Sequence, residues 1–213
     1  MNDINSKRHV MFDIKLQGID EALKQFDPQK VITAARQAIN STASSARTEA
    51  SRLIREEYNI KPSVLNKYLK VDAKATGNTL VATITGTGKG LSLINFDAKQ
   101  EGVIANKKGF RYTRKAGRTG GLRYGGAVTA LIKLTGGRTD VPGKYGNKPF
   151  IVRLKSGKLI VWERTSKARM SVKTRFGPGV GGLFGSRKIM DAIKKFINDK
   201  FGPEFSRLLN LKP

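Results

Sequence analysis

The strongest constraint on the fold is a periodic, alanine-rich segment that runs from about Pro28 to Tyr58. Asp27 can cap the free N–H groups of a first helical turn, and Pro28 suits the first helical position. Because alanine, serine and threonine bury less area than leucine, a long helix here needs a large partner surface, either a second helix or a sheet. The side chains that recur near the helical period on its predicted buried face are Val31, Ala35, Ala38, Thr42, Ala46, Ala50, Leu53 and Ile54.

Alternation of apolar and polar residues in other parts of the chain predicts a sheet. A short second helix is expected from about Lys61 to Leu69, opened by Pro62. The glycine-rich segment Gly86–Gly90 is expected to be a hairpin turn, and residues 155–158 a second tight turn between strands. The predicted strands are Val10–Leu16, Leu80–Ile84, Leu91–Phe96, Ala127–Leu134, Pro149–Leu154 and Leu159–Arg164.

A further helix is expected near the C-terminus. Ser186 can cap it, and apolar residues recur at the helical period from Ile189 to Ile197. A break is expected at Gly202-Pro203, because proline removes a helical hydrogen bond, and the apolar pattern resumes over Phe205–Leu209. Helix, antiparallel-rich sheet and helix together predict an α+β fold with long basic loops.

The length of 213 residues favours one domain with additions over two domains. We expect an N-terminal strand or arm over residues 1–26 and a single α+β domain over residues 27–213. A basic loop insertion is expected at residues 105–126 of this domain. The N-terminus shows no apolar segment followed by a cleavage site, which favours a protein that stays in the cytoplasm in which it is made.

Positive charge is the dominant feature of the composition. The chain has 41 Lys and Arg against 16 Asp and Glu, a formal net charge of +25. Residues 1–101 carry a net +4 and residues 102–213 a net +21, so the positive field belongs to the C-terminal half. Such a field indicates a polyanionic partner or an acidic protein surface.

Two acid-free stretches supply the candidate contact residues. The first lies between Glu101 and Asp140, and the second runs from Arg164 to Lys188. We expect their basic side chains to contact DNA or a neighbouring subunit. The candidates are Lys107, Lys108, Arg111, Arg114, Lys115, Arg118, Arg123, Arg138, Lys167, Arg169, Lys173 and Arg175.

The segment Asn106–Gly126 is open to more than one interpretation. Its cations are interleaved with glycines and with Phe110, Tyr112 and Tyr124, a composition suited to phosphate contact with some stacking. An arm that lies on an acidic neighbouring subunit is a second interpretation, and a solvated surface loop is a third. Its length disfavours mere solvation, because such long loops are uncommon in compact domains unless they have a function or are disordered.

The residues of catalysis are scarce. The chain has no cysteine and one histidine, which excludes thiolate chemistry and His-rich metal clusters. Gly86–Gly90 lacks the spacing of a nucleotide-binding loop, and the adjacent Glu56 and Glu57 point in different directions on a helix. Asp140, Glu163, Asp191 and Asp199 show no metal-ligand spacing. The sequence therefore predicts a non-enzymatic protein with no cofactor, and its short apolar runs predict no membrane span.

Several short stretches follow one another in an order similar to that of a known family. They are residues 34–43, 46–48, 52–55, Tyr58–Pro62, Lys148–Ile151, Ser156–Lys158, Glu163-Arg164 and Phe176–Val180. Taken together, from about Asp27 to Leu209, they resemble the minor tail protein Z, or tail completion, family of long-tailed bacteriophages. The sequence departs from that pattern in the basic insertion Lys107–Arg123 and at Gly179, where a small polar residue is expected.

The resemblance implies a structural virion protein that acts late in tail assembly. It implies a position at the head-proximal end of the tail, or neck, where the protein helps to join the tail to the head and to hold the leading DNA end. The implied partners are the tail terminator, the tail tube and the head-tail connector or portal, with subunits arranged as a six-fold homo-oligomeric ring. The virion tail is then its location, after synthesis in the host bacterial cytoplasm.

Charge alone supports a rival hypothesis from another class. A free nucleic-acid-binding protein, ribosomal or nucleoid-like, could grip phosphates through Arg111–Tyr124 without reading sequence. Steep salt dependence of binding would fit both hypotheses if DNA lies on the axis of a ring. A place among portal, tail-tube and tape-measure genes would favour the virion protein.

Overall fold

The computed structural model describes residues 10–13, 26–100, 103–106, 109–112, 127–154, 156–168 and 171–210. It has the predicted α+β fold, with a long N-terminal helix, antiparallel sheets and a C-terminal helix. Contacts divide the chain into two compact units. We call the first, Met1–Arg55 with Pro62–Lys89 and Pro178–Pro213, the helical unit, and the second, Glu56–Lys61 with Gly90–Gly177, the β unit. The division into an arm over residues 1–26 and one domain over residues 27–213 stays a prediction.

The long helix α2, Pro28–Glu57, forms as the sequence predicts. The Asp27 carboxylate accepts a hydrogen bond of 2.9 Å from the backbone N–H of Gln29, which caps the first turn. The predicted apolar face is buried apart from Leu53, which is half-buried. The buried residues of α2 are Val31, Ala34, Ala35, Ala38, Ile39, Thr42, Ala43, Ala46, Ala50, Ser51 and Ile54.

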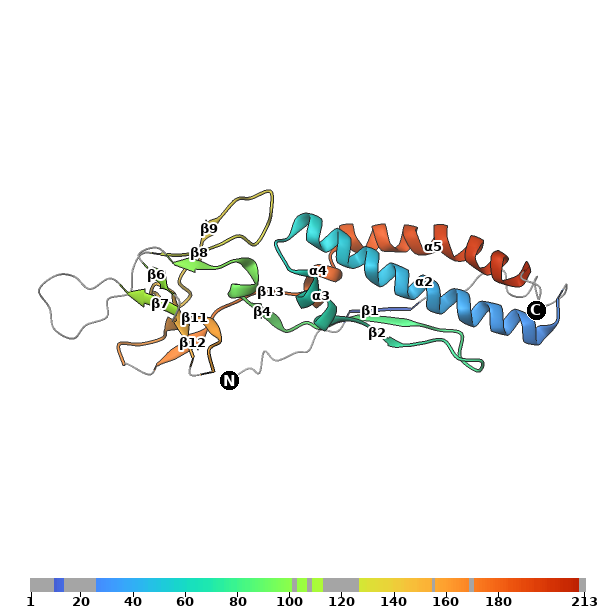
Figure 1. Ribbon diagram of the computed structural model, residues 1–213, viewed down its shortest axis with the longest axis horizontal. Coiled ribbons are helices and arrows are strands. Elements are labelled where there is room, and N and C mark those ends of the chain that lie inside the picture. Colours follow the sequence, from blue (N-terminus) through green and yellow to red (C-terminus); the bar gives the residue numbers. More distant parts are fainter. Residues whose placement is uncertain are drawn as a thin grey trace, which may run out of the picture. The chain divides into compact units, whose positions relative to one another are not determined.

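The C-terminal helix α5, Arg187–Asn210, packs along α2 in the helical unit (Figure 1). Small side chains at the start of α2 allow α5 to approach closely, and the larger side chains of α5 fill the space between them. One apolar cluster joins the two helices, made of Val31, Ala34, Ala35, Ala38, Phe205 and Leu209.

The predicted break in α5 is wrong. Pro203 lies inside the helix, which runs without interruption to Asn210. Proline cannot supply one helical hydrogen bond, but burial of Phe205 and Leu209 against α2 holds the following turns in helical form. The expected cap is also absent, since the buried Ser186 hydroxyl has no hydrogen-bond partner among the described residues.

Three antiparallel strands form the sheet of the helical unit, in the order β1-β3-β2. They are β1 (Val10–Asp13), β2 (Leu69–Ala73) and β3 (Thr83–Gly86), and helix α3 (Pro62–Tyr68) leads directly into β2. In the register, Ile84 of β3 lies opposite both Phe12 of β1 and Val71 of β2. Residues 14–16 of the predicted first strand lie outside the described residues.

Two side chains of α2 bind it to this sheet. The Asn40 amide donates to the carbonyl of Ala75 at 3.0 Å and accepts from the N–H of the same residue at 2.8 Å. Arg47 donates to the carbonyl of Leu69 at 3.0 Å. Because these bonds use backbone groups beside β2, they fix the helix relative to the strands.

The predicted hairpin at Gly86–Gly90 is wrong. Strand β3 pairs with β1 and β2, whereas β4 (Gly90–Ser92) pairs with β13 (Phe176–Gly179). Residues Leu93–Phe96, expected to continue a strand, form the 3₁₀ helix η1. Alternation predicts a strand but does not identify its partner, and here the partner comes from a distant part of the chain.

Glycine allows a close approach between this segment and the short helix α4, Val180–Phe184. The N–H of Gly181 donates to the carbonyl of Thr87 at 2.8 Å. A Cβ atom on Gly86 would lie 3.1 Å from the Cα of Gly181, and one on Gly179 would lie 2.5 Å from the carbonyl oxygen of Lys89. This crowding explains why glycine stands at position 179, where the family resemblance leads us to expect a small polar residue.

The β unit consists of short antiparallel sheets. One has the order β5-β8-β9, a second has the order β10-β11-β12, and β6 pairs with β7. The strands are β5 (Lys99–Gln100), β6 (Val103–Asn106), β7 (Gly109–Tyr112), β8 (Val128–Ala130), β9 (Thr139–Asp140), β10 (Phe150–Arg153), β11 (Leu159–Arg164) and β12 (Val172–Thr174).

The predicted hairpin of β10 and β11 is confirmed, with Gly157 at a φ of 80° in its turn. The strand expected over Ala127–Leu134 is only partly correct, because β8 ends at Ala130. Residues beyond it bond instead to the chain after α2, as Asn59 donates to the carbonyl of Ile132 at 3.0 Å. Leu134, the last residue of the predicted strand, is 46% exposed.

Candidate functional surface

The β unit holds most of the excess positive charge. Its residues include 21 Lys and Arg against 6 Asp and Glu, compared with 20 against 10 in the helical unit. The smaller unit therefore has a formal net charge of +15 and fewer than one carboxylate for every three cations. The position of the few carboxylates therefore decides which cations are available to a partner.

The structure describes the side chains of four predicted contact residues: Arg138, Lys167, Lys173 and Arg175. Arg111 is described only as part of the backbone of β7. The remaining predicted contact residues lie outside the described residues, and they are Lys107, Lys108, Arg114, Lys115, Arg118, Arg123 and Arg169.

Arg138 and Arg175 are held by partners within the β unit. Arg138 bonds to both the carbonyl and the carboxylate of Asp97. The Nε of Arg175 lies 3.3 Å from the Glu163 carboxylate, and its Nη2 donates to the carbonyl of Pro142 at 3.1 Å. Lys167 and Lys173, in contrast, are exposed, and neither has a carboxylate within 4.0 Å among the described residues.

Glu163 is the centre of this arrangement. It lies on β11, is fully buried and is the one acidic residue between Asp140 and Asp191. Besides the ion pair with Arg175, its carboxylate accepts hydrogen bonds from the N–H groups of Lys144 at 2.9 Å and Tyr145 at 2.5 Å. A buried carboxylate needs such partners, so the loop and the sheet are held together by one side chain.

The loop from Val141 to Pro149, which we call the 141–149 loop, is shaped by these bonds. A Cβ atom on Gly143 would lie 2.4 Å from the carbonyl oxygen of Asn147, so the loop closes tightly there. Gly146 adopts a φ of 79°, and the Asn147 amide donates to the carbonyl of Arg164 at 3.0 Å. The loop is therefore hydrogen-bonded to β11 on both sides of Gly146, through Lys144 and Tyr145 before it and Asn147 after it.

The loop and β12 together present a cationic, aromatic surface. Tyr145 is 37% exposed. The Nζ atoms of Lys144 and Lys173 lie 5.9 Å and 5.3 Å from the centre of its ring. Sequence reasoning included Lys173 and missed Lys144 and Tyr145. The isolated acid Glu163 in a basic region was the available signal, because such an acid often organises nearby polar groups.

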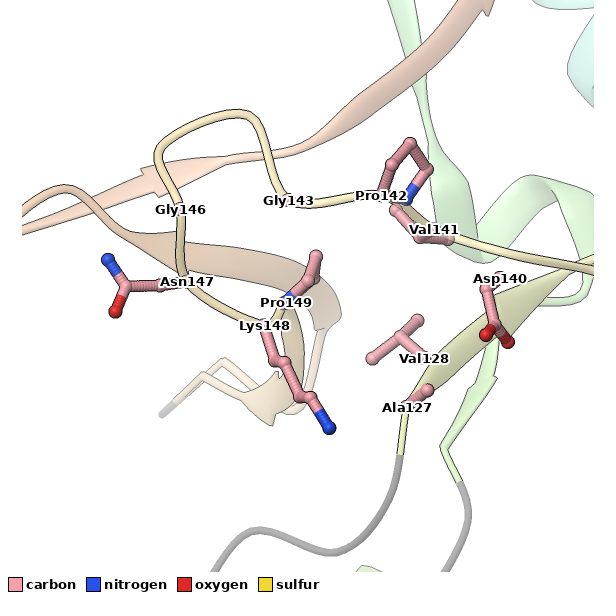
Figure 2. Close-up of a pocket in the computed structure, with 10 residues that line it drawn as sticks. All are labelled: Ala127, Val128, Asp140, Val141, Pro142, Gly143, Gly146, Asn147, Lys148 and Pro149. Atoms are coloured by element: carbon pink, nitrogen blue, oxygen red, sulfur yellow. The ribbon is translucent and has the colours of Figure 1, made fainter.

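A pocket of about 370 Å³ lies beside the same loop (Figure 2). Figure 2 shows Lys148 and Asp140 on its two sides with Val128 between them, and the other lining residues are small, apolar or amide-bearing. The lining residues that the structure describes bring together no nucleophile with a base. Among the described residues there is also no group of three His, Cys, Asp or Glu side chains that could hold a metal ion.

Comparison with known proteins identifies the family. The sequence model of prophage minor tail protein Z (GPZ) matches residues 16–211, which is most of the chain. The chain belongs to the minor tail protein Z family. It is a structural protein of a phage tail. No curated protein and no solved structure matches the chain significantly.

Three of the stretches that carry the family resemblance connect elements of the fold, whereas residues 34–43, 46–48 and 52–55 lie within α2. The Tyr58–Pro62 junction links α2 to α3, and Lys148–Ile151 leads from the 141–149 loop into β10. Phe176–Val180 spans β13 and opens α4. None of the helices among the described residues is both long and apolar enough to cross a membrane.

Proposed function

We propose that this minor tail protein is a tail completion protein. It acts at the head-proximal end of the tail, where it joins the tail to the head and positions the end of the DNA. The observation that carries this proposal is the concentration of positive charge on the β unit of a phage tail protein, 21 Lys and Arg against 6 Asp and Glu. A tail protein beside packaged DNA has a direct use for such a field, since phosphate contact depends on cations rather than on a catalytic site.

The role is non-enzymatic and needs no cofactor. Joining requires surfaces that recognise neighbouring proteins, so the partners proposed are the tail terminator, the tail tube and the head-tail connector or portal. A homo-oligomeric ring, six-fold like a phage tail, would repeat the basic face around one axis and multiply its field. Native mass spectrometry of the purified chain should then show a hexamer, and a monomer at all concentrations would contradict the ring.

Amber suppression of the gene tests the function directly. Lysates without the protein should contain full-length tails that fail to join heads or to deliver DNA, as seen by electron microscopy and by mixing heads and tails in vitro. Adding the purified chain should restore joining. If infectious particles form normally without it, the proposal is wrong and a free nucleic-acid-binding protein becomes the better explanation.

A further inference from the structure

The cations of the β unit differ in how they are held. Arg138 and Arg175 are engaged with carboxylates, whereas Lys144 and Lys173 have no carboxylate within 4.0 Å among the described residues. Both ammonium groups lie against the ring of Tyr145, on a loop that Glu163 fixes to the sheet. The two ammonium groups are therefore available to a partner and are positioned before it binds.

We propose that Lys144, Tyr145 and Lys173 form a preassembled binding site for the phosphate backbone of DNA. Glu163 and Arg175 are its positioning residues. This inference rests on the proposed function and deepens it, because it assigns DNA contact to a structured surface.

The spacing of the two lysines suits a chain of phosphates. Since each Nζ lies within 6 Å of the same ring centre, the two are at most about 11 Å apart. A DNA strand carries one charge per about 3.4 Å of helix axis, and its phosphates wind around the axis and so lie farther apart than this in space. Two lysines within that span can therefore contact neighbouring phosphates of one strand. The Tyr145 hydroxyl adds a hydrogen-bond donor beside the two charges. Lysine acts here as a point charge, which contacts phosphate without reading sequence.

The loop that carries the surface is held by hydrogen bonds within the β unit. The Glu163 carboxylate accepts hydrogen bonds from the N–H groups of Lys144 and Tyr145. In the same loop, Gly143 packs closely against Asn147, whose amide donates to the carbonyl of Arg164. A partner therefore orders little more than two lysine side chains, which lowers the entropic cost of binding. The large cation excess of the β unit favours a regular polyanion over an acidic protein surface, whose carboxylates are interspersed with positive charges.

Salt-dependent binding of the full chain to a 20-base-pair duplex of mixed sequence tests the proposal. The double variant Lys144→Ala with Lys173→Ala should lower the slope of log affinity against log salt by about 1.8, as expected for two lost phosphate contacts. Affinity should fall by about tenfold per contact near 0.1 M salt. Thermal unfolding should be unchanged, because truncating exposed lysines rarely affects stability.

A matched control distinguishes the effect of this site from the effect of removing two positive charges anywhere on the β unit. Lys61→Ala with Lys158→Ala removes the same charge from exposed positions of the β unit. Lys158 directly precedes β11 and is five residues from Glu163, roughly 17 Å along the strand direction. The control should change the slope by much less than the test pair. Equal effects of the two double variants would overturn the proposal.

Glu163→Gln tests the positioning role. This variant makes the chain more positive by one charge, so if Glu163 acts only through its charge, DNA binds more tightly. If Glu163 positions the lysines, DNA binds more weakly and the salt slope falls. Asn147→Ala loosens the same loop without a charge change and should weaken binding in the same way. Unchanged or tighter binding by both variants would overturn the positioning role.

The outcomes also distinguish this inference from the proposed function. If the lysine pair loses DNA binding but its virions form and infect normally, the site exists and the role in positioning DNA fails. If head-tail joining is lost while the duplex affinity and slope stay unchanged, the surface binds an acidic protein partner and the DNA site is wrong.

Discussion

Arg138 donates one hydrogen bond to the backbone carbonyl of Asp97, at 2.6 Å, and a second to the carboxylate of the same residue. Asp97 ends η1 in the left-handed region, with a φ of 53°, so a residue from a distant loop stabilises an unusual turn. Lys99 adds a third contact, 3.3 Å from the same carboxylate. Partial burial raises the pKa of Asp97, but hydrogen bonds and charges from Arg138 and Lys99 outweigh it and hold that pKa below its ordinary value.

This ion cluster predicts a pH-dependent stability. A lowered folded pKa means that the ionised Asp97 stabilises the fold above the unfolded pKa of about 3.9, and that this contribution is lost as pH falls through the folded value. Asp97→Asn keeps a residue that tolerates the turn and should lower the free energy of unfolding at pH 7 by less than about 1 kcal/mol, because the pair is partly exposed and screened by solvent. Urea unfolding at pH 7 and below pH 3 measures the difference, which should disappear in acid. A difference that grows in acid would contradict the assignment.

Removing Glu163 should destabilise the β unit strongly. Glu163→Ala leaves the N–H groups of Lys144 and Tyr145 without their acceptor and the largely buried Arg175 without its opposite charge. Breaking a buried pair in this way costs about 3–5 kcal/mol. Glu163→Gln should cost less, since its amide oxygen still accepts a hydrogen bond. Urea unfolding of both variants checks the order, and an Ala variant as stable as the parent would show that the loop is not held by this carboxylate.

The glycines at the start of α4 should respond to substitution in opposite directions. Gly179→Ala places a methyl group 2.5 Å from the carbonyl oxygen of Lys89 and 2.7 Å from that of Gly88, so backbone must shift and stability should fall by about 1–3 kcal/mol. Gly182→Ala meets nothing within 4 Å and lies in the helix, so it should raise stability by about 0.5–1 kcal/mol. Calorimetric melting temperatures measure both, and equal effects would rule out the close packing of this segment.

Pro203 should destabilise α5, and its replacement should make the protein more stable. Pro203 is exposed to solvent and lies within the residue range of α5. An alanine at this position would restore a backbone N–H that can donate to the carbonyl of Asp199. We expect Pro203→Ala to raise the free energy of unfolding by up to about 3 kcal/mol. Ser206→Ala, an exposed change in the same helix, should contribute only about 0.5 kcal/mol. A Pro203→Ala variant that is less stable than the parent would contradict this prediction, because proline would then stabilise this position of the helix.

The predicted contact set shows how far sequence reasoning reached the candidate surface. Charge counting selected Arg138, Lys167, Lys173 and Arg175 alike, because it treats every cation in an acid-free stretch as available. The structure separates them, since Asp97 and Glu163 hold the two arginines. Lys144 was not among the predicted contact residues because it lies close to Asp140 and outside both acid-free stretches, although Asp140 is not its partner. Which cation meets which carboxylate depends on chain folding over long separations.

The sequence by itself determined the elements whose signals are local. The period of small residues and the Asp27 cap specify α2, and Ser156-Gly157 specifies the turn between β10 and β11, because the interacting residues are close along the chain. Tertiary structure decided the partners of β3, the continuity of α5 through Pro203 and the attachment of the 141–149 loop to Glu163. Each of these depends on burial or hydrogen bonding between distant segments, and neither periodicity nor composition encodes which distant segments meet.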